Sequence, residues 1–201
     1  AGVVAHELGH NYGLNHANFW DTAGKSVIGA GQSLEYGDIF DTMGGSGGGI
    51  RQFNARYKSL LNWLPSTGVQ TVTTNGTYTV AAHDDPEATG IRALRVSRNS
   101  QTNYWIEFRG LFTNQPAMVD GVSVRWARNL NQSTLLLDST PGTLDGRNDA
   151  GLMVGRTFSD MDAGVHITPI RRLGTHPDAM EVVVNRGLFP GNRAPTVVVA
   201  A

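Results

Sequence analysis

The sequence predicts an α+β fold in which a short helical region is followed by a longer β-rich region, and three observations support this. The first residues carry His and Glu at helical spacing. Apolar residues in the segment 53–64 recur at intervals of three and four, which is also typical of a helix. Beyond Pro65 the chain changes to short alternating runs separated by turn residues, as expected for an antiparallel sandwich or barrel.

The first helical segment contains the motif HExxHxxGxxH. His6 and His10 are four residues apart, so a helix presents both rings on one face, where a single metal ion can bind them. The Glu7 side chain lies beside the two rings but points in a different direction. This suits a carboxylate that deprotonates water and does not bind the metal itself. Gly13 is expected to take a left-handed conformation that ends the helix and brings His16 back as a third ligand. Three protein ligands leave one position open, as in catalytic zinc sites.

This motif resembles the zinc-binding consensus of the metzincin clan of metallopeptidases. The resemblance implies one catalytic Zn²⁺ as cofactor, protein or peptide substrates, and hydrolysis of peptide bonds with Glu7 as general base. It also implies a tight turn whose Met forms the apolar floor of the metal site. Asp41-Thr42-Met43-Gly44 stands where this Met-turn is expected, so Met43 is assigned a structural role.

Other positions refine the resemblance. Ala17, the residue after the third His, matches none of the signatures of astacins, adamalysins, matrixins and serralysins. Gly45 occupies the position where astacins and serralysins carry a Tyr, so no tyrosine is predicted to assist from there. The segment 53–65 is similar to the helix after the Met-turn in gametolysin-like secreted peptidases.

The predicted organisation has three parts. Residues 1–65 form the C-terminal half of a metzincin catalytic lobe, 66–190 an antiparallel β-sandwich domain, and 191–201 a linker or the start of a further repeat. The second helix, 53–64, is capped by Gln52 or Asn54 and stopped by Pro65. The predicted strands are 69–73, 77–82, 91–96, 104–109, 122–127, 134–137, 153–158, 165–169 and 180–185.

Alternation within these strands predicts which residues face the core. In the segment 104–109, Tyr104, Ile106 and Phe108 should face the interior while Glu107 and Arg109 face water. His83, His166 and His176 are scattered through the β-rich region and are interpreted as surface or hydrogen-bonded histidines rather than metal ligands.

Residues 17–52 show few regular patterns and are interpreted as loops around the metal site. The run of glycines at 44–49 is interpreted as a flexible loop at the rim of a cleft. Glu35, Asp38 and Asp41 are interpreted as solvated loop acids, and a Ca²⁺ site is the alternative.

Composition excludes several classes of partner. The net charge of −1 gives no electrostatic basis for binding nucleic acid or an anionic membrane, and no apolar run is long enough to span a bilayer. The chain has no Cys, which is compatible with export from a bacterial or algal cell, and a secreted, extracellular protein is predicted. The sequence begins directly inside the motif helix, so we expect an N-terminally truncated fragment with further domains of the parent chain on both sides.

Two functional hypotheses follow from the sequence. The first is a zinc-dependent endopeptidase that uses His6, His10 and His16 as ligands and Glu7 as general base. The second is a β-sandwich module that binds substrate or glycan and is attached to an inactive or incomplete metal lobe.

Overall fold

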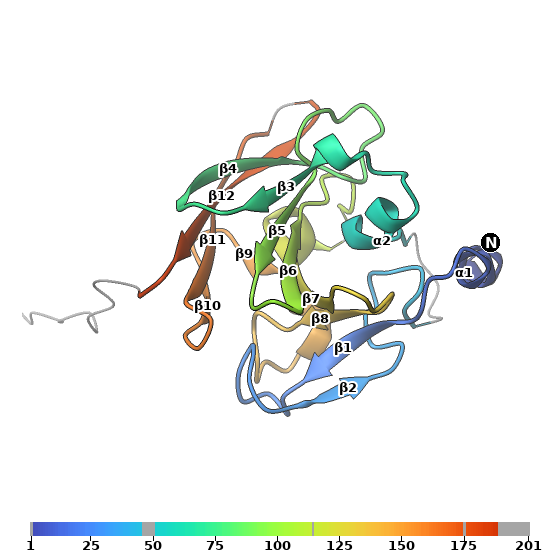
Figure 1. Cartoon of the computed structure of the whole chain (residues 1–201), viewed down its shortest axis with the longest axis horizontal. Helices are drawn as coiled ribbons and strands as arrows, with labels where there is room; N and C mark the ends of the chain where they lie inside the picture. Colours follow the sequence, from blue (N-terminus) through green and yellow to red (C-terminus); the bar gives the residue numbers. More distant parts are fainter. Residues whose placement is uncertain (1, 46–50, 114, 175, 189–201) are drawn as a thin grey trace, which may run out of the picture.

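The computed structural model describes residues 2–45, 51–113, 115–174 and 176–188. Within these ranges the chain is α+β, with most regular residues in two sheets and few helices (Figure 1). The helices are α1 (Gly2–Asn11), α2 (Ala55–Leu60) and α3 (Pro116–Val119), with 3₁₀ turns at Ser66–Gly68 and Gly146–Asp149. The strands are β1 (Ala17–Asp21), β2 (Gln32–Leu34), β3 (Val69–Val72), β4 (Gly76–Ala81), β5 (Ala93–Ser97), β6 (Thr102–Glu107), β7 (Gly121–Arg128), β8 (Thr134–Leu137), β9 (Leu152–Met153), β10 (Phe158–Asp160), β11 (Val165–Arg172) and β12 (Ala179–Arg186).

The larger sheet has eight strands in the order β2-β1-β8-β7-β6-β5-β3, with β9 paired to β7, and the smaller sheet has the order β10-β11-β12-β4. Most neighbours are antiparallel, but β1 pairs with β8 and β3 pairs with β5 in parallel. Because β1 and β2 join β8, residues on both sides of the predicted boundary at residue 65 contribute strands to one sheet.

Alternation along the strands produces an apolar core between the two sheets. Tyr104 and Ile106 of β6 and Val122 and Val124 of β7 are fully buried, as predicted for Tyr104 and Ile106. They pack in one cluster with residues of the smaller sheet that include Ile167, Met180, Val182 and Val184. Burial of such side chains is the main stabilising contribution to the fold.

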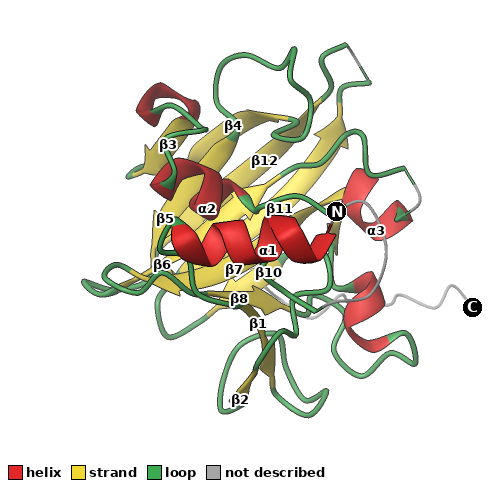
Figure 2. Cartoon of the chain, turned by 90° about the vertical axis from the view of Figure 1, so that its right-hand side faces the viewer, coloured by secondary structure: helices red, strands yellow, loops and turns green. Residues whose placement is uncertain are grey.

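The opposite face of the larger sheet is also buried, and here the sequence prediction was wrong. Glu107 and Arg109 were predicted to face water, but each is only 1% exposed, and Arg125 of β7 is fully buried. This face is covered by α2 and by the loop that leads to Met43, as Figure 2 shows for α2 in front of the strands. A period-two pattern therefore identified two faces correctly, but it could not show that both are covered.

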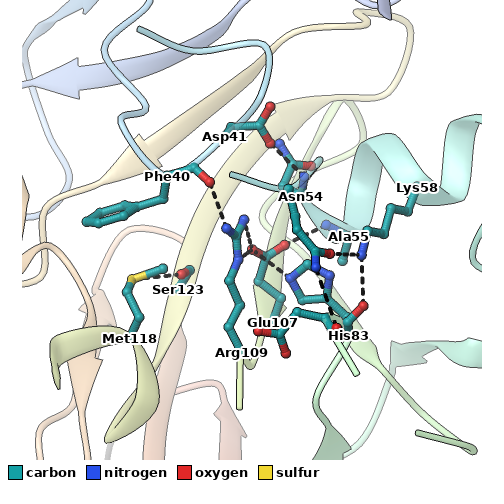
Figure 3. Close-up of polar contacts among 12 residues, drawn as sticks. Phe40, Asp41, Asn54, Ala55, Lys58, His83, Glu107, Arg109, Met118 and Ser123 are labelled. Atoms are coloured by element: carbon teal, nitrogen blue, oxygen red, sulfur yellow. Dashed lines mark hydrogen bonds and ion pairs between the residues drawn. The ribbon is translucent and has the colours of Figure 1, made fainter. Parts of the chain in front are cut away.

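The buried charges on this face form one ionic cluster. Arg125 donates from Nε to Asp38 Oδ2 and from Nη1 to Glu107 Oε1, both at 2.6 Å. Arg109 donates to the same Glu107 oxygen at 3.0 Å and to the carbonyl of Phe40 at 2.7 Å (Figure 3). The second oxygen of Glu107 accepts the backbone N–H of Ala55, at the start of α2, at 2.6 Å. The cluster thus connects the sheet, α2 and the loop 38–43.

Most predicted elements were confirmed with shifted ends. The predicted helix 53–64 is shorter, because Asn62 adopts a left-handed conformation with φ of +57° after α2 has ended at Leu60. Asn54 is its N-cap and accepts the N–H of Tyr57, which confirms one of the two predicted caps. The predicted strand 153–158 is wrong, since β9 ends at Met153 and β10 begins at Phe158.

Two predictions fall wholly or partly on residues outside the described ranges. The glycine run at 44–49 is described only as far as Gly45, and the segment after residue 190, predicted as a linker or further repeat, lies entirely outside. In the part of the chain that is described, none of the helices combines the length and apolar character that crossing a bilayer requires.

The ionic cluster leads to a stability prediction. Replacing Arg125 by Met would leave Asp38 and Glu107 buried without their main counter-charge, and we expect the free energy of unfolding to fall by about 3–5 kcal/mol. The measurement is chemical denaturation of the purified variant. The matched control is Arg171→Met, because Arg171 forms an exposed pair with Glu181 and such pairs contribute about 0–1 kcal/mol. Equal effects of the two substitutions would contradict the proposed importance of the cluster.

Candidate metal centre

The three motif histidines converge at the end of α1. His6 and His10 lie on the same face of this helix, with ring centroids 4.8 Å apart. The helix ends at Asn11, and Gly13 has a φ of +85°, a conformation that Gly adopts without the steric cost of a side chain. Its N–H donates to the carbonyl of His10 at 2.8 Å. The turn carries the chain back to His16, whose ring centroid lies 4.9 Å from that of His10.

Each of the three rings is anchored through Nδ1. His6 Nδ1 lies 2.9 Å from the carbonyl oxygen of Thr42, and His10 Nδ1 lies 2.8 Å from that of Leu14. His16 Nδ1 lies 2.8 Å from a carboxylate oxygen of Glu35. Carbonyl and carboxylate oxygens only accept hydrogen bonds, so each Nδ1 carries the proton and each Nε2 has a free lone pair. Hydrogen-bond partners of this kind at Nδ1 orient metal-binding histidines in known metal sites.

The Nε2 atoms are spaced as ligands of one ion. His10 Nε2 lies 3.2 Å from His6 Nε2 and 3.1 Å from His16 Nε2. Two nitrogens that bind zinc at about 2.0–2.1 Å in a tetrahedron are about 3.3 Å apart, close to these values. Three lone pairs that face each other repel unless a cation lies between them. The donor set therefore fits Zn²⁺, and within the described residues it is the one such group of His, Cys, Asp or Glu side chains.

Glu7 lies on α1 next to His6 and is exposed to solvent. In the described part of the chain it does not join the cluster of potential ligand atoms formed by His6, His10 and His16. It is therefore a carboxylate beside the candidate ligands and does not belong to their group. A solvent-accessible carboxylate in this place can exchange protons with water near the metal position.

Met43 lies beneath the helix that carries the ligands. It is fully buried and clusters with Leu14, Ala17 and Tyr57. Gly9 makes the close approach possible, because a Cβ at this position would lie 2.2 Å from Met43 Sδ and 3.1 Å from Phe53 Cε1. Gly9 is also the buried residue of α1 in the described structure. Contact with Met43 and its neighbours therefore holds α1 against the rest of the molecule.

Asp41 holds the turn that presents Met43. Its Oδ1 accepts the N–H of Met43 at 2.7 Å, and its Oδ2 accepts the N–H of Asn54 at 2.6 Å. Burial and the nearby Asp38 carboxylate raise the pKa of Asp41 to about 7. The interpretation of Asp38 and Asp41 as solvated loop acids was wrong, because both are fully buried. Asp38 pairs with Arg125, and the exposed Glu35 pairs with His16, so the three acids do not converge on a calcium position.

His83 lies at the edge of the ionic cluster. Its Nε2 is 3.3 Å from Glu107 Oε1, but neither ring nitrogen makes a well-aligned hydrogen bond to the described residues (Figure 3). Burial lowers the pKa of His83 to about 4 in spite of the Glu107 carboxylate, whose charge is already matched by Arg125 and Arg109. Burial would raise the pKa of Glu107, but these neighbouring cations hold it well below its usual range. His83 is accordingly a neutral buried side chain near neutral pH.

Two residues beside the metal site were not predicted to take part in it. Glu35 was interpreted as a solvated loop acid, with a Ca²⁺ site as the alternative, and Tyr36 was not considered. The ring of Tyr36 lies with its centroid 3.9 Å from that of His16 and 5.9 Å from that of His6. No local pattern indicated these contacts, because β1 and β2, which bring the loop to the site, were not predicted as strands.

Comparison of the chain with protein families, with curated proteins and with solved structures found no match.

The contact between Gly9 and Met43 leads to a prediction of unusual sign. Gly→Ala within a helix normally stabilises it by about 0.5–1 kcal/mol, but Gly9→Ala should destabilise the protein by about 1–3 kcal/mol because Met43 and Phe53 have to move. We also expect weaker zinc binding, measured by competition with a chelating dye. The control is Gly2→Ala on the same helix, where an added Cβ meets nothing within 4 Å. If both variants were equally stable, the close packing described for Gly9 would be incorrect.

The environment of His83 predicts a pH dependence of stability. Its pKa is about 4 in the folded protein against an ordinary 6.5, so the unfolded chain binds the proton first as the pH falls. The stability advantage of the neutral ring is therefore present above pH 6.5 and is lost between pH 6.5 and pH 4. We expect the difference in unfolding free energy between the protein and His83→Leu to change by up to about 1.4 kcal/mol per pH unit in this window. Taking the difference cancels the titration of groups that both proteins share.

The control for this measurement is Gln101→Leu, because Gln101 is exposed and carries no titratable group. Its difference from the unmodified protein should stay nearly constant over the same window. A constant difference for His83→Leu as well would mean that His83 is not held neutral by burial.

Proposed function

We propose that this chain is the catalytic part of a zinc-dependent endopeptidase of metzincin type, secreted from the cell and acting on protein or peptide substrates. The observation that carries the proposal is the convergence of three Nε2 lone pairs, each directed by a hydrogen bond at the opposite nitrogen of its ring. The exposed Glu7 beside them and the buried Met43 below supply the further features that the resemblance implies.

The donor set determines which ion is expected. Three neutral imidazoles without a thiolate suit Zn²⁺, and three protein ligands leave a position open for reaction. When bound, zinc would polarise the substrate carbonyl and lower the pKa of water to about 7. His6, His10 and His16 would hold the ion, and their Nδ1 partners would keep the rings in place.

Glu7 is assigned the proton transfers. In this proposal its carboxylate takes a proton from the attacking water, whose oxygen forms a bond to the carbonyl carbon of the scissile peptide. The same carboxyl group then gives the proton to the amide nitrogen, so that the C–N bond breaks and the amine leaves. One water is consumed, and the two products are a carboxylic acid and an amine.

A separate cavity supports the second candidate function, a module that binds substrate or glycan. The cavity has a volume of about 450 Å³, within the range of ligand sites, and is lined by residues of β1, β7 and β8 with their neighbouring loops. Its walls include Trp20 and Trp126, which offer aromatic surface, and Arg98, Asn18 and Asn131, which offer hydrogen-bonding groups. Binding there is compatible with an active or an inactive metal centre.

Replacement of Glu7 by Gln separates the two functions. We expect Glu7→Gln to bind one zinc per chain with unchanged affinity, because the three ligands stay, while peptide cleavage falls by about 10²–10⁴-fold. Zinc content is measured by atomic spectroscopy and cleavage with a fluorogenic peptide library. The control is Glu87→Gln, an exposed acid outside the metal centre, which should leave both values unchanged. Zinc binding without any cleavage by the unmodified protein would favour the binding module, and absence of zinc binding would reject the metal centre.

A further inference from the structure

The loop after β2 places two consecutive residues against the metal centre. Glu35 accepts the Nδ1 proton of His16 at 2.8 Å. The ring of the next residue, Tyr36, lies across His16 at 3.9 Å between centroids with an interplanar angle of 36°, and it also stacks on His6 at 5.9 Å and 27°. One ligand is thus held at its Nδ1 edge by a carboxylate and over its ring by an aromatic side chain.

The backbone of this loop is fixed in an uncommon conformation. Tyr36 has a φ of +58°, in the left-handed region that bulky residues rarely adopt. Its N–H donates to Asn18 Oδ1 at 3.1 Å, which ties the loop to β1. The pairing of Phe19 with Leu34 holds β1 and β2 together directly before Glu35. An unfavourable conformation of this kind persists only where the surrounding structure determines it, and it occurs often at functional sites.

The three ligands differ in how they are supported. His6 and His10 are fixed by α1, and their Nδ1 atoms donate to backbone carbonyls. His16 lies beyond the helix, after the turn at Gly13, and its Nδ1 partner is a charged side chain. A carboxylate partner orients the ring and also makes the imidazole a stronger electron donor to a metal. The Glu35 side chain is 67% exposed, so water competes for its hydrogen bond to His16. Packing of the neighbouring Tyr36 ring against His16 helps to keep the loop in place.

We propose that Glu35 and Tyr36 are positioning residues of the metal centre, which together fix the orientation and basicity of His16. This proposal depends on the proposed function in one respect, namely that His6, His10 and His16 bind a metal. Glu35 acts through its charge and hydrogen bond, and Tyr36 acts through the face of its ring and not through its hydroxyl group.

Metal affinity tests the role of Glu35. In zinc competition titrations, Glu35→Gln should bind zinc about 10–100-fold more weakly than the unmodified protein, and Glu35→Ala at least as weakly. Gln keeps an acceptor oxygen but removes the charge, whereas Ala removes both. Comparing the zinc affinities of the two variants therefore separates the effect of the hydrogen bond from that of the charge. Glu87→Gln, in an exposed loop away from the three histidines, is the control and should not change the affinity.

The role of Tyr36 is tested with a similar pair of variants. Tyr36→Phe keeps the ring and should bind zinc within about twofold of the unmodified protein, whereas Tyr36→Ala should bind about 10-fold more weakly, since the ring that covers His16 is lost. Tyr12→Ala is the control, because Tyr12 is also an exposed tyrosine but its ring contacts Trp63.

The visible absorption of the Co²⁺-substituted protein provides a readout that simple loss of stability does not change. Glu35→Gln and Tyr36→Ala should alter the positions or intensities of the cobalt bands, while the melting temperatures of the metal-free proteins stay close to that of the unmodified chain. Unchanged zinc affinity and cobalt spectra in both variants would overturn the proposal.

His16→Ala distinguishes failure of this proposal from failure of the proposed function. If His16→Ala loses zinc while Glu35→Ala and Tyr36→Ala keep full affinity, the positioning role is rejected and the metal centre remains. If the unmodified protein binds zinc no better than His16→Ala, the metal centre itself is rejected, and the positioning role with it.

Discussion

The buried ionic cluster centred on Arg125 holds the larger sheet against the loop 38–43. Arg125 is fully buried and binds both Asp38 of the loop before Met43 and Glu107 of β6. Moving the loop away from the sheet would leave buried charges without their partners, which is energetically costly. Arg109 adds a contact to the Phe40 carbonyl in the same loop. Charge pairing here adds to apolar packing on the same face, where Ala55, Leu64, Trp105 and Ala127 belong to one buried cluster.

The cluster reaches the candidate metal centre through the turn that carries Met43. Asp41, in the same loop as Asp38, accepts the N–H groups of Met43 and Asn54. The carbonyl of the next residue, Thr42, accepts from His6 Nδ1. The helix α1 contributes little burial of its own, since Gly9 is its buried residue in the described structure. The position of His6 and His10 relative to the rest of the molecule is consequently set by the contact of α1 with a loop that the β-rich region holds in place.

The elements that could be predicted from the sequence are those with strong local signals. Asn54 capped the second helix as expected, and the predicted strand 134–137 has the same ends in the structure, because apolar periodicity and turn residues act over a few neighbouring positions. The strands β1 and β2 were missed, since Trp20 interrupts the alternation in β1 and β2 is short and exposed. Pairing holds β1 to β8 and β2 to β1. Long-range pairing of this kind leaves little trace in local sequence.

The identity and order of the three candidate ligands were readable from the sequence, because the spacing of four residues and the glycine-dependent turn at Gly13 are local geometry that a short segment specifies. The tertiary structure alone decided that Glu107 and Arg125 are buried, that Asp38 is an ion-pair partner rather than a solvated acid, and that Glu35 and Tyr36 contact His16. Alternation along a strand shows which residues share a face, but whether that face meets water or another segment depends on residues far away in the chain, and burial is a property of the whole fold.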